Sequence, residues 1–317
     1  MAHEPAKDRY GRMKYRAAGR SGLKLPIISL GAWETFGGYV DDATTRACLL
    51  RAFDLGVTHF DFANGYGHPP GNAELVCGKV IAELPRDELI ISTKAGYPMW
   101  PGPYGDGGSR KYLIASCDQS LKRLGVDYVD VFYHHRPDPQ TPIEETIGAL
   151  ATLVQQGKAL YIGVSSYSGK QYLAALEAAK AHGVPITLHQ PFYSMLARRI
   201  ESDLLPHTGE HGSGVIGFAP LASGLLTDKH LDGDVPAGDR GALWPGQWVR
   251  GHSQEERAAV LQGLHALAKA RGQTLAQMAL AWVVRDEAVT SALVGASRVA
   301  QVEANVAAIE NLNFSAD

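Results

Sequence analysis

The sequence contains few cysteines, and they lie far apart. Its 317 residues include only Cys48, Cys77 and Cys117, with no CxxC pair. The small odd number excludes a disulfide framework, and the lack of a pair excludes the commonest thiolate metal and redox motifs. Sparse, unpaired cysteines are typical of a reducing compartment. We therefore expect a cytoplasmic protein in which these thiols are small buried fillers.

An excess of one charge and long hydrophobic runs are also missing. The 30 basic and 33 acidic residues leave a net charge of −3, with no basic tract or acidic tail, so no nucleic-acid partner is expected. No stretch approaches the roughly 18 apolar residues of a membrane span, and residues 1–14 lack the apolar segment of a signal peptide. No membrane partner is expected either.

A regular alternation of strand-like and helix-like segments is present instead. Short apolar runs, most of them rich in β-branched or aromatic residues, alternate with longer amphipathic stretches from about residue 27 onward. The runs cover residues 27–31, 58–62, 89–94, 129–133, 160–164, 186–189, 215–218 and 291–294. The amphipathic stretches include residues 113–124, 144–156 and 170–181. Eight parallel βαβ units are the number that closes a barrel, so the prediction is an α/β protein with a (β/α)8 TIM barrel.

An open, doubly wound parallel sheet is the alternative fold. It normally carries a glycine fingerprint directly after its first strand, whereas Ala32, Trp33 and Glu34 stand there. A barrel of about 250 residues or more forms one domain, so residues 1–317 are predicted to be a single domain in which 1–13 form a flexible tail.

Three further segments interrupt or precede the alternation of strand and helix. Residues 15–16 and 23–25 flank Gly19 to Gly22, which indicates a short β-hairpin before the barrel. Residues 97–111 and 229–252 are rich in Gly, Pro and Trp. Both are too long for simple connectors, so we expect long functional loops at the C-terminal face.

Polar side chains of four kinds (a carboxylate, a phenol, an amine and an imidazole) stand at or just after the ends of successive predicted strands, where barrels of this kind place their chemistry. Asp61 ends the second strand and Tyr66 follows it, Lys94 ends the third, and His134 and His135 follow the fourth. Taken singly, each has a structural explanation, such as a helix cap, a surface aromatic, a solvated strand end or a core histidine. Their convergence on one mouth indicates a catalytic site. Because side chains alternate along a strand, one histidine faces this mouth, and spacing does not say which.

This set of groups suits proton donation to a carbonyl oxygen that receives a hydride. A free phenol has a pKa of about 10. We expect the Lys94 ammonium, paired with the Asp61 carboxylate, to lower the pKa of Tyr66 so that it acts as general acid. An imidazole can polarise the carbonyl. Since side chains cannot supply a hydride, a nicotinamide cofactor is implied.

Several motifs resemble those of the aldo-keto reductases, and the resemblance runs from about Lys14 to Phe314. Its carriers are residues 56–67 (GVTHFDFANGYG), Ser92-Thr93-Lys94 and Gly163-Val164-Ser165-Ser166. Within this superfamily the chain is most similar to the branch of bacterial L-glyceraldehyde 3-phosphate reductases and potassium-channel β subunits. That similarity rests on residues 94–105, 107–113, 189–191, 220–227 and 295–298.

The resemblance implies the catalytic histidine and the cofactor. His135, rather than His134, matches the family's catalytic histidine, and the channel subunits have asparagine there, so an active enzyme is favoured over a nicotinamide-binding regulatory subunit. NADPH is implied as the cofactor, because a serine and an arginine at the adenosine end suit a 2′-phosphate. Residues expected to contact the cofactor are Ala32, Trp33, Asp61, Ser165, Ser166, Gln190, Phe218, Ala219, Pro220, Leu221, Ala222, Ser223, Lys229, Arg240, Gly295, Ser297, Arg298, Gln301 and Asn305.

One position departs from the family pattern. Ala304 stands where the family usually has a glutamate, and Glu303 is one residue early. We therefore expect a weaker or rebuilt contact with the adenine.

The implied reaction is the reduction of a small aldehyde or ketone, with L-glyceraldehyde 3-phosphate as the hypothesis for the substrate. Substrate contacts are predicted at Trp33, Tyr66, Trp100, His135 and Arg110. Arg110 and Lys111 are candidates for holding a phosphate, or they simply open a surface helix. A barrel isomerase or lyase without nicotinamide is a further alternative. No metal is expected, because the histidines lack ligand spacing and His207 and His211 look like loop residues; a homo-oligomer is compatible with the resemblance.

Overall fold

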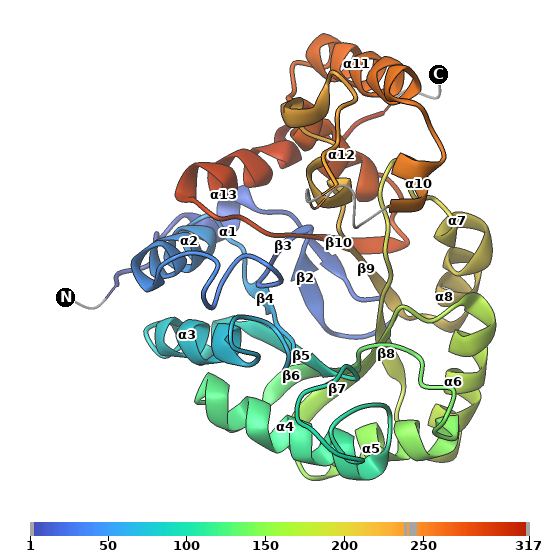
Figure 1. Cartoon of the computed structure of the whole chain (residues 1–317). Coiled ribbons are helices and arrows are strands. Elements are labelled where there is room, and N and C mark those ends of the chain that lie inside the picture. Colours follow the sequence, from blue (N-terminus) through green and yellow to red (C-terminus); the bar gives the residue numbers. More distant parts are fainter. Residues whose placement is uncertain (1–2, 238–239, 241–245, 315–317) are drawn as a thin grey trace.

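Parallel strands close into a barrel in the computed structural model of the chain, which describes residues 3–237, 240 and 246–314 (Figure 1). The strands of the barrel are β3 (Ile28–Gly31), β4 (His59–Asp61), β5 (Ile90–Ala95), β6 (Val129–His134), β7 (Ala159–Ser165), β8 (Ile186–Gln190), β9 (Gly214–Phe218) and β10 (Val289–Val294). β10 pairs with β3, Ala292 opposite Ile28, and this pairing closes the sheet. The predicted (β/α)8 barrel is thereby confirmed, and the open doubly wound sheet is excluded.

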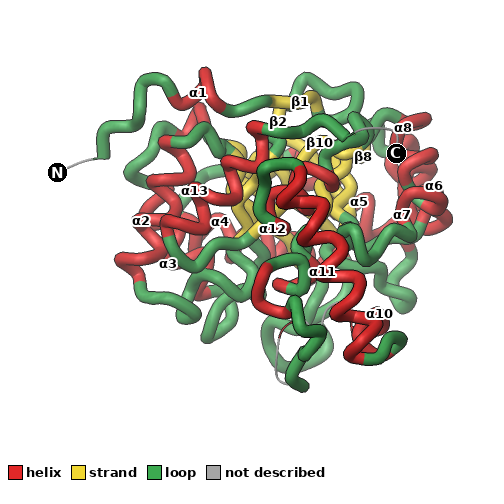
Figure 2. Tube along the Cα trace, turned by 90° about the horizontal axis from the view of Figure 1, so that it is seen from above, coloured by secondary structure: helices red, strands yellow, loops and turns green. Residues whose placement is uncertain are grey.

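Helices surround the barrel, as Figures 1 and 2 show. They are α1 (Arg9–Arg12), α2 (Asp42–Asp54), α3 (Asn72–Ile81), α4 (Arg110–Leu124), α5 (Ile143–Gln155), α6 (Gly169–Ala181), α7 (Ile200–Asp203), α8 (Leu205–His211), α10 (Gly246–Arg250), α11 (Gln254–Ala270), α12 (Leu275–Val283) and α13 (Val299–Val306). Side-chain caps fix several of their starts: the Ser109 hydroxyl accepts from the backbone of α4, and Ser168 with Gln171 forms a capping box on α6. His207 and His211 lie in α8, so their predicted loop position is wrong.

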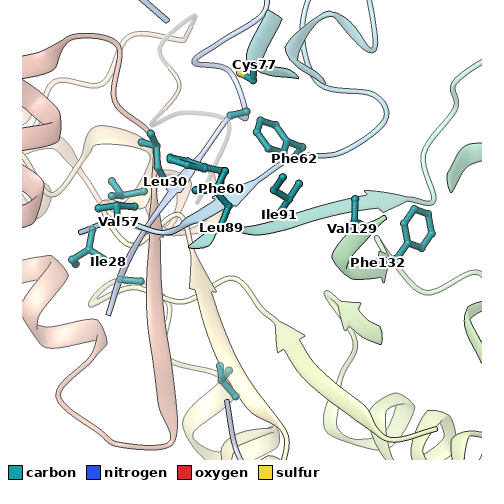
Figure 3. Packing of buried hydrophobic residues seen from close by; sticks show 14 of the residues in the cluster. Ile28, Leu30, Val57, Phe60, Phe62, Cys77, Leu89, Ile91, Val129 and Phe132 are labelled. Atoms are coloured by element: carbon teal, nitrogen blue, oxygen red, sulfur yellow. The ribbon is translucent and has the colours of Figure 1, made fainter. Parts of the chain in front are cut away.

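Apolar side chains on the outer face of the strands pack against the helices. Figure 3 shows part of this layer, with Leu30, Phe60 and Ile91 packed together. The neighbours of Phe60 in β4, His59 and Asp61, point the other way, into the barrel, because successive side chains of a strand alternate. The strand sequences therefore read as continuous buried runs, since both faces of the sheet are covered.

The barrel interior is divided into a polar and an apolar part. Buried polar side chains of adjacent strands β10, β3, β4 and β5 fill one part; they are Ser291, Ser29, His59, Asp61, Ser92 and Lys94. Buried apolar side chains, mainly of β6, β8 and β9, fill the other; they include Val131, Tyr133, Leu188 and Ile216. The polar part leads to the carboxyl ends of the strands, where Asp61 and Lys94 lie.

A hairpin covers the opposite end of the barrel. β1 (Tyr15–Ala17) pairs antiparallel with β2 (Lys24–Pro26), as predicted, and both lie across one end of the strands in Figure 2. Leu23 and Leu25 pack into the apolar cluster of the interior. The turn is tight, because Gly19 has φ +58° and an added Cβ would lie 2.1 Å from the carbonyl oxygen of Gly212. The hairpin therefore plugs the amino-terminal end of the barrel.

The remaining segments are the start of the chain and the long loops. Residues 3–13, expected to form a flexible tail, contact the domain: the backbone N–H of Ala6 donates to Asp54, and Arg9 pairs with Glu88. Residues 96–109 connect β5 to α4 without a helix or strand, and the predicted loop 229–252 contains α10. No helix of the described residues has the length and apolar character needed to cross a membrane.

Candidate active site

A cavity of about 510 Å³ opens at the carboxyl ends of the strands. Loops after β3, β4, β5, β6, β7, β9 and β10 contribute to its wall, as does Arg240 from the segment after Lys229. The predicted site residues that line it are Trp33, Asp61, Tyr66, His135, Ser165, Ser166, Gln190, Phe218, Ala219, Pro220, Leu221, Ser223, Arg240, Gly295, Ser297 and Gln301. The residues predicted from strand ends and those implied by the resemblance thus meet in one cavity.

A buried ion pair forms the floor of this cavity. Lys94 Nζ lies 2.5 Å from Asp61 Oδ2 and donates to the carbonyl oxygen of Phe62 at 2.6 Å. Both side chains are almost fully buried, Lys94 at 0% and Asp61 at 1% exposure. Asp61 Oδ1 also accepts hydrogen bonds from the Ser92 hydroxyl, at 2.6 Å, and from the Gln190 amide, at 3.1 Å. Such complete pairing is what allows two charges to remain in a dry interior.

Tyr66 and His135 lie above this pair. The Tyr66 hydroxyl is 3.4 Å from His135 Nε2, and Lys94 Nζ is 5.0 Å from the centre of the Tyr66 ring. Tyr97 packs edge-on against His135, with ring centres 4.8 Å apart. His134 points away from the cavity and is buried, its Nδ1 2.7 Å from the Tyr167 hydroxyl. Of the two histidines, His135 is therefore the one that meets the phenol.

The titration of these groups differs from the sequence-based expectation in one respect. The sequence predicts that Lys94 lowers the pKa of Tyr66, whereas burial and then the negative charge of Asp61 raise this pKa well above its usual 10. Burial, followed by the positive charge of Lys94, holds the pKa of His135 well below 6.5. At neutral pH the phenol therefore carries its proton, and the imidazole is neutral. The Lys94 ammonium, 5.0 Å from the centre of the Tyr66 ring, is placed where it can stabilise a negative charge on the phenol oxygen.

Strained backbone is concentrated around the cavity. The non-glycine residues with a positive φ in the described chain are Glu34, Ser166, Ala219, Ala222 and Ser223. Four of them, all except Ala222, line the cavity. Non-glycine residues in this conformation cost roughly 1–3 kcal/mol each and gather at functional sites. The strained backbone therefore lies in the same region as the side chains of the candidate site.

The segment Ala219 to Ser223 offers a place for an anion. Three of its residues have a positive φ, and Ala219, Pro220, Leu221 and Ser223 line the cavity. The Ser223 hydroxyl is buried and has no hydrogen-bond partner among the described residues. Arg240, which also lines the cavity, brings a guanidinium group that is paired with Glu34. These features fit a pyrophosphate group at this wall.

The neighbouring wall, which follows β10, carries the residues expected at the adenosine end. Ser297 lines the cavity and donates from its backbone N–H and its hydroxyl to the Gln301 side chain, at 2.8 and 3.0 Å. Asn305 is buried behind Gly295 and donates to its carbonyl oxygen. Glu303 pairs with Arg51 of α2 at 2.8 Å and thus does not replace the missing glutamate at position 304.

Some predicted residues lie outside the cavity. Among the described residues, Ala32, Lys94, Trp100, Arg110, Ala222, Lys229, Arg298 and Asn305 are not part of its lining. Lys94 lies directly beneath it, and Trp100 packs on Tyr112 with ring centres 5.0 Å apart. The Arg110 guanidinium donates to the Gly148 carbonyl and to Thr152 of α5. The placement of Arg110 therefore supports the helix-opening alternative and not a substrate-phosphate site.

Other residues of the site are missing from the sequence-based prediction. Glu34 lines the cavity and pairs with Arg240 at 2.7 Å, closing one side of it. Tyr97 and Pro98 also line it and belong to the long loop after β5, whose composition is the only signal that pointed to them. Ser92 lies beneath the cavity and holds Asp61. A serine inside an apolar strand run gives no sign of that contact.

Comparison with known proteins agrees with this geometry. A family model described as "Aldo/keto reductase family" matches residues 27–317. The chain is 52% identical over 316 residues to L-glyceraldehyde 3-phosphate reductase of Escherichia coli (strain K12), covering 97% of this chain and 91% of that protein. It is 40% identical over 305 residues to a probable voltage-gated potassium channel subunit beta of Arabidopsis thaliana, covering 94% and 92%. A crystal structure of a thermostable aldo-keto reductase in complex with the inhibitor epalrestat matches with a TM-score of 0.76 and 30% identity, over 96% of both chains.

Proposed function

The chain belongs to the aldo/keto reductase family, and from this premise we propose that it uses NADPH to reduce a small aldehyde or ketone to the alcohol, with Tyr66 as general acid. The observation that supports this most directly is the position of the Tyr66 hydroxyl, 3.4 Å from His135 Nε2 and above the Asp61–Lys94 pair. A carbonyl oxygen placed between the phenol and the imidazole meets two hydrogen-bond donors.

The residues of the cavity fit the cofactor. The segment Ala219 to Ser223 runs along the cavity wall, has a buried hydroxyl without a partner among the described residues, and suits the pyrophosphate. Ser165, Ser166 and Gln190 would hold the carboxamide, Phe218 would stack on the nicotinamide, and Ser297 with Gln301 would face the adenosine end. When bound, the nicotinamide supplies the hydride.

The protein's own part in the reaction is to donate one proton to the substrate oxygen and to stabilise the tyrosinate that remains. The carbonyl carbon gains the hydride while the oxygen takes the proton of Tyr66, which is favourable because an alkoxide is a stronger base than a phenolate. The Lys94 ammonium stabilises the resulting tyrosinate, and Asp61 keeps that ammonium charged in its dry surroundings. His135, neutral at pH 7, donates one N–H to the substrate oxygen and orients it. Solvent then returns the proton to Tyr66.

Removal of the phenolic hydroxyl tests this assignment. Tyr66→Phe is expected to lower kcat by about 100-fold or more, since a positioned general acid contributes about 10²–10⁴. NADPH binding, followed by fluorescence, should persist, because the phenyl ring remains. Near-normal turnover of a simple aldehyde by the variant would show that Tyr66 is not the acid.

A small phosphorylated aldehyde is the proposed substrate. The support is the 52% identity to a protein named L-glyceraldehyde 3-phosphate reductase. We expect kcat/KM for L-glyceraldehyde 3-phosphate to exceed that for L-glyceraldehyde by about tenfold or more, as one charge-assisted contact provides. Equal kcat/KM values for the two substrates would show that the enzyme does not prefer a phosphorylated aldehyde.

The Arg110→Ala variant serves as a control in the same assay. Since the Arg110 side chain bonds to α5, we expect this variant to keep the ratio of the two kcat/KM values. If the ratio of the two kcat/KM values instead fell to about one in Arg110→Ala, Arg110 would have to contact the substrate phosphate.

A regulatory subunit is the second candidate, because the chain is 40% identical to a potassium channel subunit beta. The contact between His135 and Tyr66 favours the reductase over this candidate. Steady turnover of an aldehyde with NADPH separates the two. Cytoplasmic location and homo-oligomer formation stay predictions.

A further inference from the structure

A continuous chain of hydrogen-bonding side chains crosses the polar part of the barrel interior and ends on Asp61. Ser291 Oγ lies 2.6 Å from Ser29 Oγ, and Ser29 Oγ lies 2.8 Å from His59 Nδ1. His59 Nε2 is 2.9 Å from Ser92 Oγ, which donates to Asp61 Oδ1 at 2.6 Å. Ser291, Ser29, His59 and Ser92 are all fully buried. None of them lines the cavity.

The charge on Asp61 fixes the direction of every bond in this chain. An ionised carboxylate only accepts, so Ser92 must give its single proton to Asp61. The Ser92 oxygen then accepts from His59, which requires the imidazole proton on Nε2. His59 Nδ1 is left as an acceptor for the Ser29 hydroxyl, and Ser29 in turn accepts from Ser291. All the O–H and N–H dipoles therefore point toward Asp61.

We propose that Ser92 and His59, the latter as the neutral Nε2–H tautomer, are positioning residues for the reductase reaction, because they hold the Asp61 carboxylate that keeps Lys94 charged beneath Tyr66. This role rests on the proposed function. Neither side chain touches substrate or cofactor.

The division of bonds on Asp61 explains why such a support is needed. Oδ2 faces Lys94, while Oδ1 takes the bonds from Ser92 and Gln190. Without the Ser92 bond, Oδ1 keeps one donor in a dry interior, and the ionised form of the pair becomes less favourable. Lys94 then stabilises the charge on Tyr66 less well.

The surroundings of His59 keep it neutral. Its ring nitrogens meet two serine hydroxyls, and the charged groups that act on it are Asp61 and Lys94. Burial lowers the pKa of His59 to about 4; Asp61 raises it, and Lys94 lowers it. The imidazole therefore stays uncharged at neutral pH and acts through its fixed dipole.

Substitution of Ser92 is the first test. In Ser92→Ala we expect kcat to fall by about 10- to 100-fold, as loss of a hydrogen bond to a charged group predicts. The KM for NADPH should stay within about twofold. Ser92→Thr, which keeps the hydroxyl, should recover most of kcat. Unchanged kcat in Ser92→Ala would overturn the proposal.

Thr187→Val provides a matched control for the loss of a buried hydroxyl. Thr187 lies in β8, is 3% exposed, and its hydroxyl has no partner among the described residues. The replacement has the same shape and should leave kcat unchanged. An equal loss in Thr187→Val and Ser92→Ala would mean that any buried hydroxyl matters only for packing, which also overturns the proposal.

The tautomer of His59 is the second test, and it does not depend on turnover. In the wild-type protein with ¹⁵N-labelled histidine, the His59 signal, assigned from its loss in His59→Gln, should show a proton on Nε2 only, unchanged from about pH 6 to 8. A proton on Nδ1, or titration in this range, would overturn the proposal. If the wild type itself fails to reduce any aldehyde with NADPH, the proposed function fails, whereas the tautomer remains a separate result.

Discussion

At the scale of single residues, the site is built from groups whose resting protonation states are unusual. Burial raises the pKa of Tyr66 and lowers that of His135, each well beyond its ordinary value. A phenol that holds its proton and an imidazole that stays neutral are both in the form needed for carbonyl reduction over a wide pH range. In the proposed reaction, the buried Asp61–Lys94 pair supplies the charge that stabilises the tyrosinate.

The pH profile of the reduction follows from these two shifts. A raised pKa means that Tyr66 loses its proton only above about pH 10, and a lowered pKa means that His135 gains one only well below about 6.5. We therefore expect kcat/KM for a non-ionising aldehyde to be flat from about pH 6.5 to 9. Initial rates across a series of constant-ionic-strength buffers give this profile. A bell-shaped curve with a limb near neutrality would contradict it.

The composition of the site could be predicted from the sequence, but not the direction of every side chain. Asp61 and Lys94 are recognisable because each is a charged residue at the end of a buried strand. His134 and His135 are adjacent, and only the resemblance or the structure separates them. The position of Arg110 in the sequence predicts a place near the substrate, yet the first residue of a helix can point to a neighbouring helix, as it does here.

At the scale of elements, the strands and helices are well determined by sequence, and the loops are not. The eight predicted strands correspond to β3 to β10, since each is a short apolar run buried on both faces. Helix starts lie one to three residues before their predicted positions in α4, α5 and α6. The ion pair between Glu34 and Arg240 joins loops far apart in the sequence, and no local pattern indicates it.

The hairpin that plugs the barrel allows a test of one turn. In Gly19→Ala, the new Cβ would meet the Gly212 carbonyl at 2.1 Å, and φ at this position is +58°. We expect the free energy of unfolding to fall by about 1–3 kcal/mol, measured by urea denaturation, with kcat unchanged because the hairpin is remote from the cavity.

Gly22 in the same turn provides the control for this substitution. An added Cβ there meets nothing within 4 Å. Gly22→Ala should therefore leave the midpoint of denaturation almost unchanged. Equal effects of the two substitutions would show that the contact with Gly212 is not what makes Gly19 necessary.

At the scale of the whole molecule, the cavity is assembled from loops that leave the barrel at many points around its rim. Trp33 and Glu34 follow β3, Ser165 ends β7 and Ser166 follows it, and Gly295 to Ser297 follow β10. A ligand that spans the cavity therefore ties these loops together. Its binding should stabilise the folded state as a whole.

The dependence of unfolding on cofactor measures this coupling. At about 100 times its Kd, NADPH is expected to raise the free energy of unfolding by about 2.7 kcal/mol, which a thermal scan detects as a higher Tm. NADH at the same concentration should raise it less, because it lacks the 2′-phosphate. An equal rise in Tm with both cofactors would show that the protein does not prefer NADPH. No rise in Tm with either cofactor would show that this cavity is not a cofactor site.

The hairpin of β1 and β2, which covers one end of the barrel, also bears on the order in which ligands enter and leave the cavity. With that end of the barrel covered and the hydrogen-bonded chain ending at buried Ser291, molecules and protons reach the floor from the other side. In the proposed reaction, the cofactor, the substrate, the product and the proton that returns to Tyr66 would therefore all pass through the cavity opening. The ligand nearest the opening must then leave before a deeper one can be exchanged, so we expect product release as well as chemistry to limit the rate of turnover.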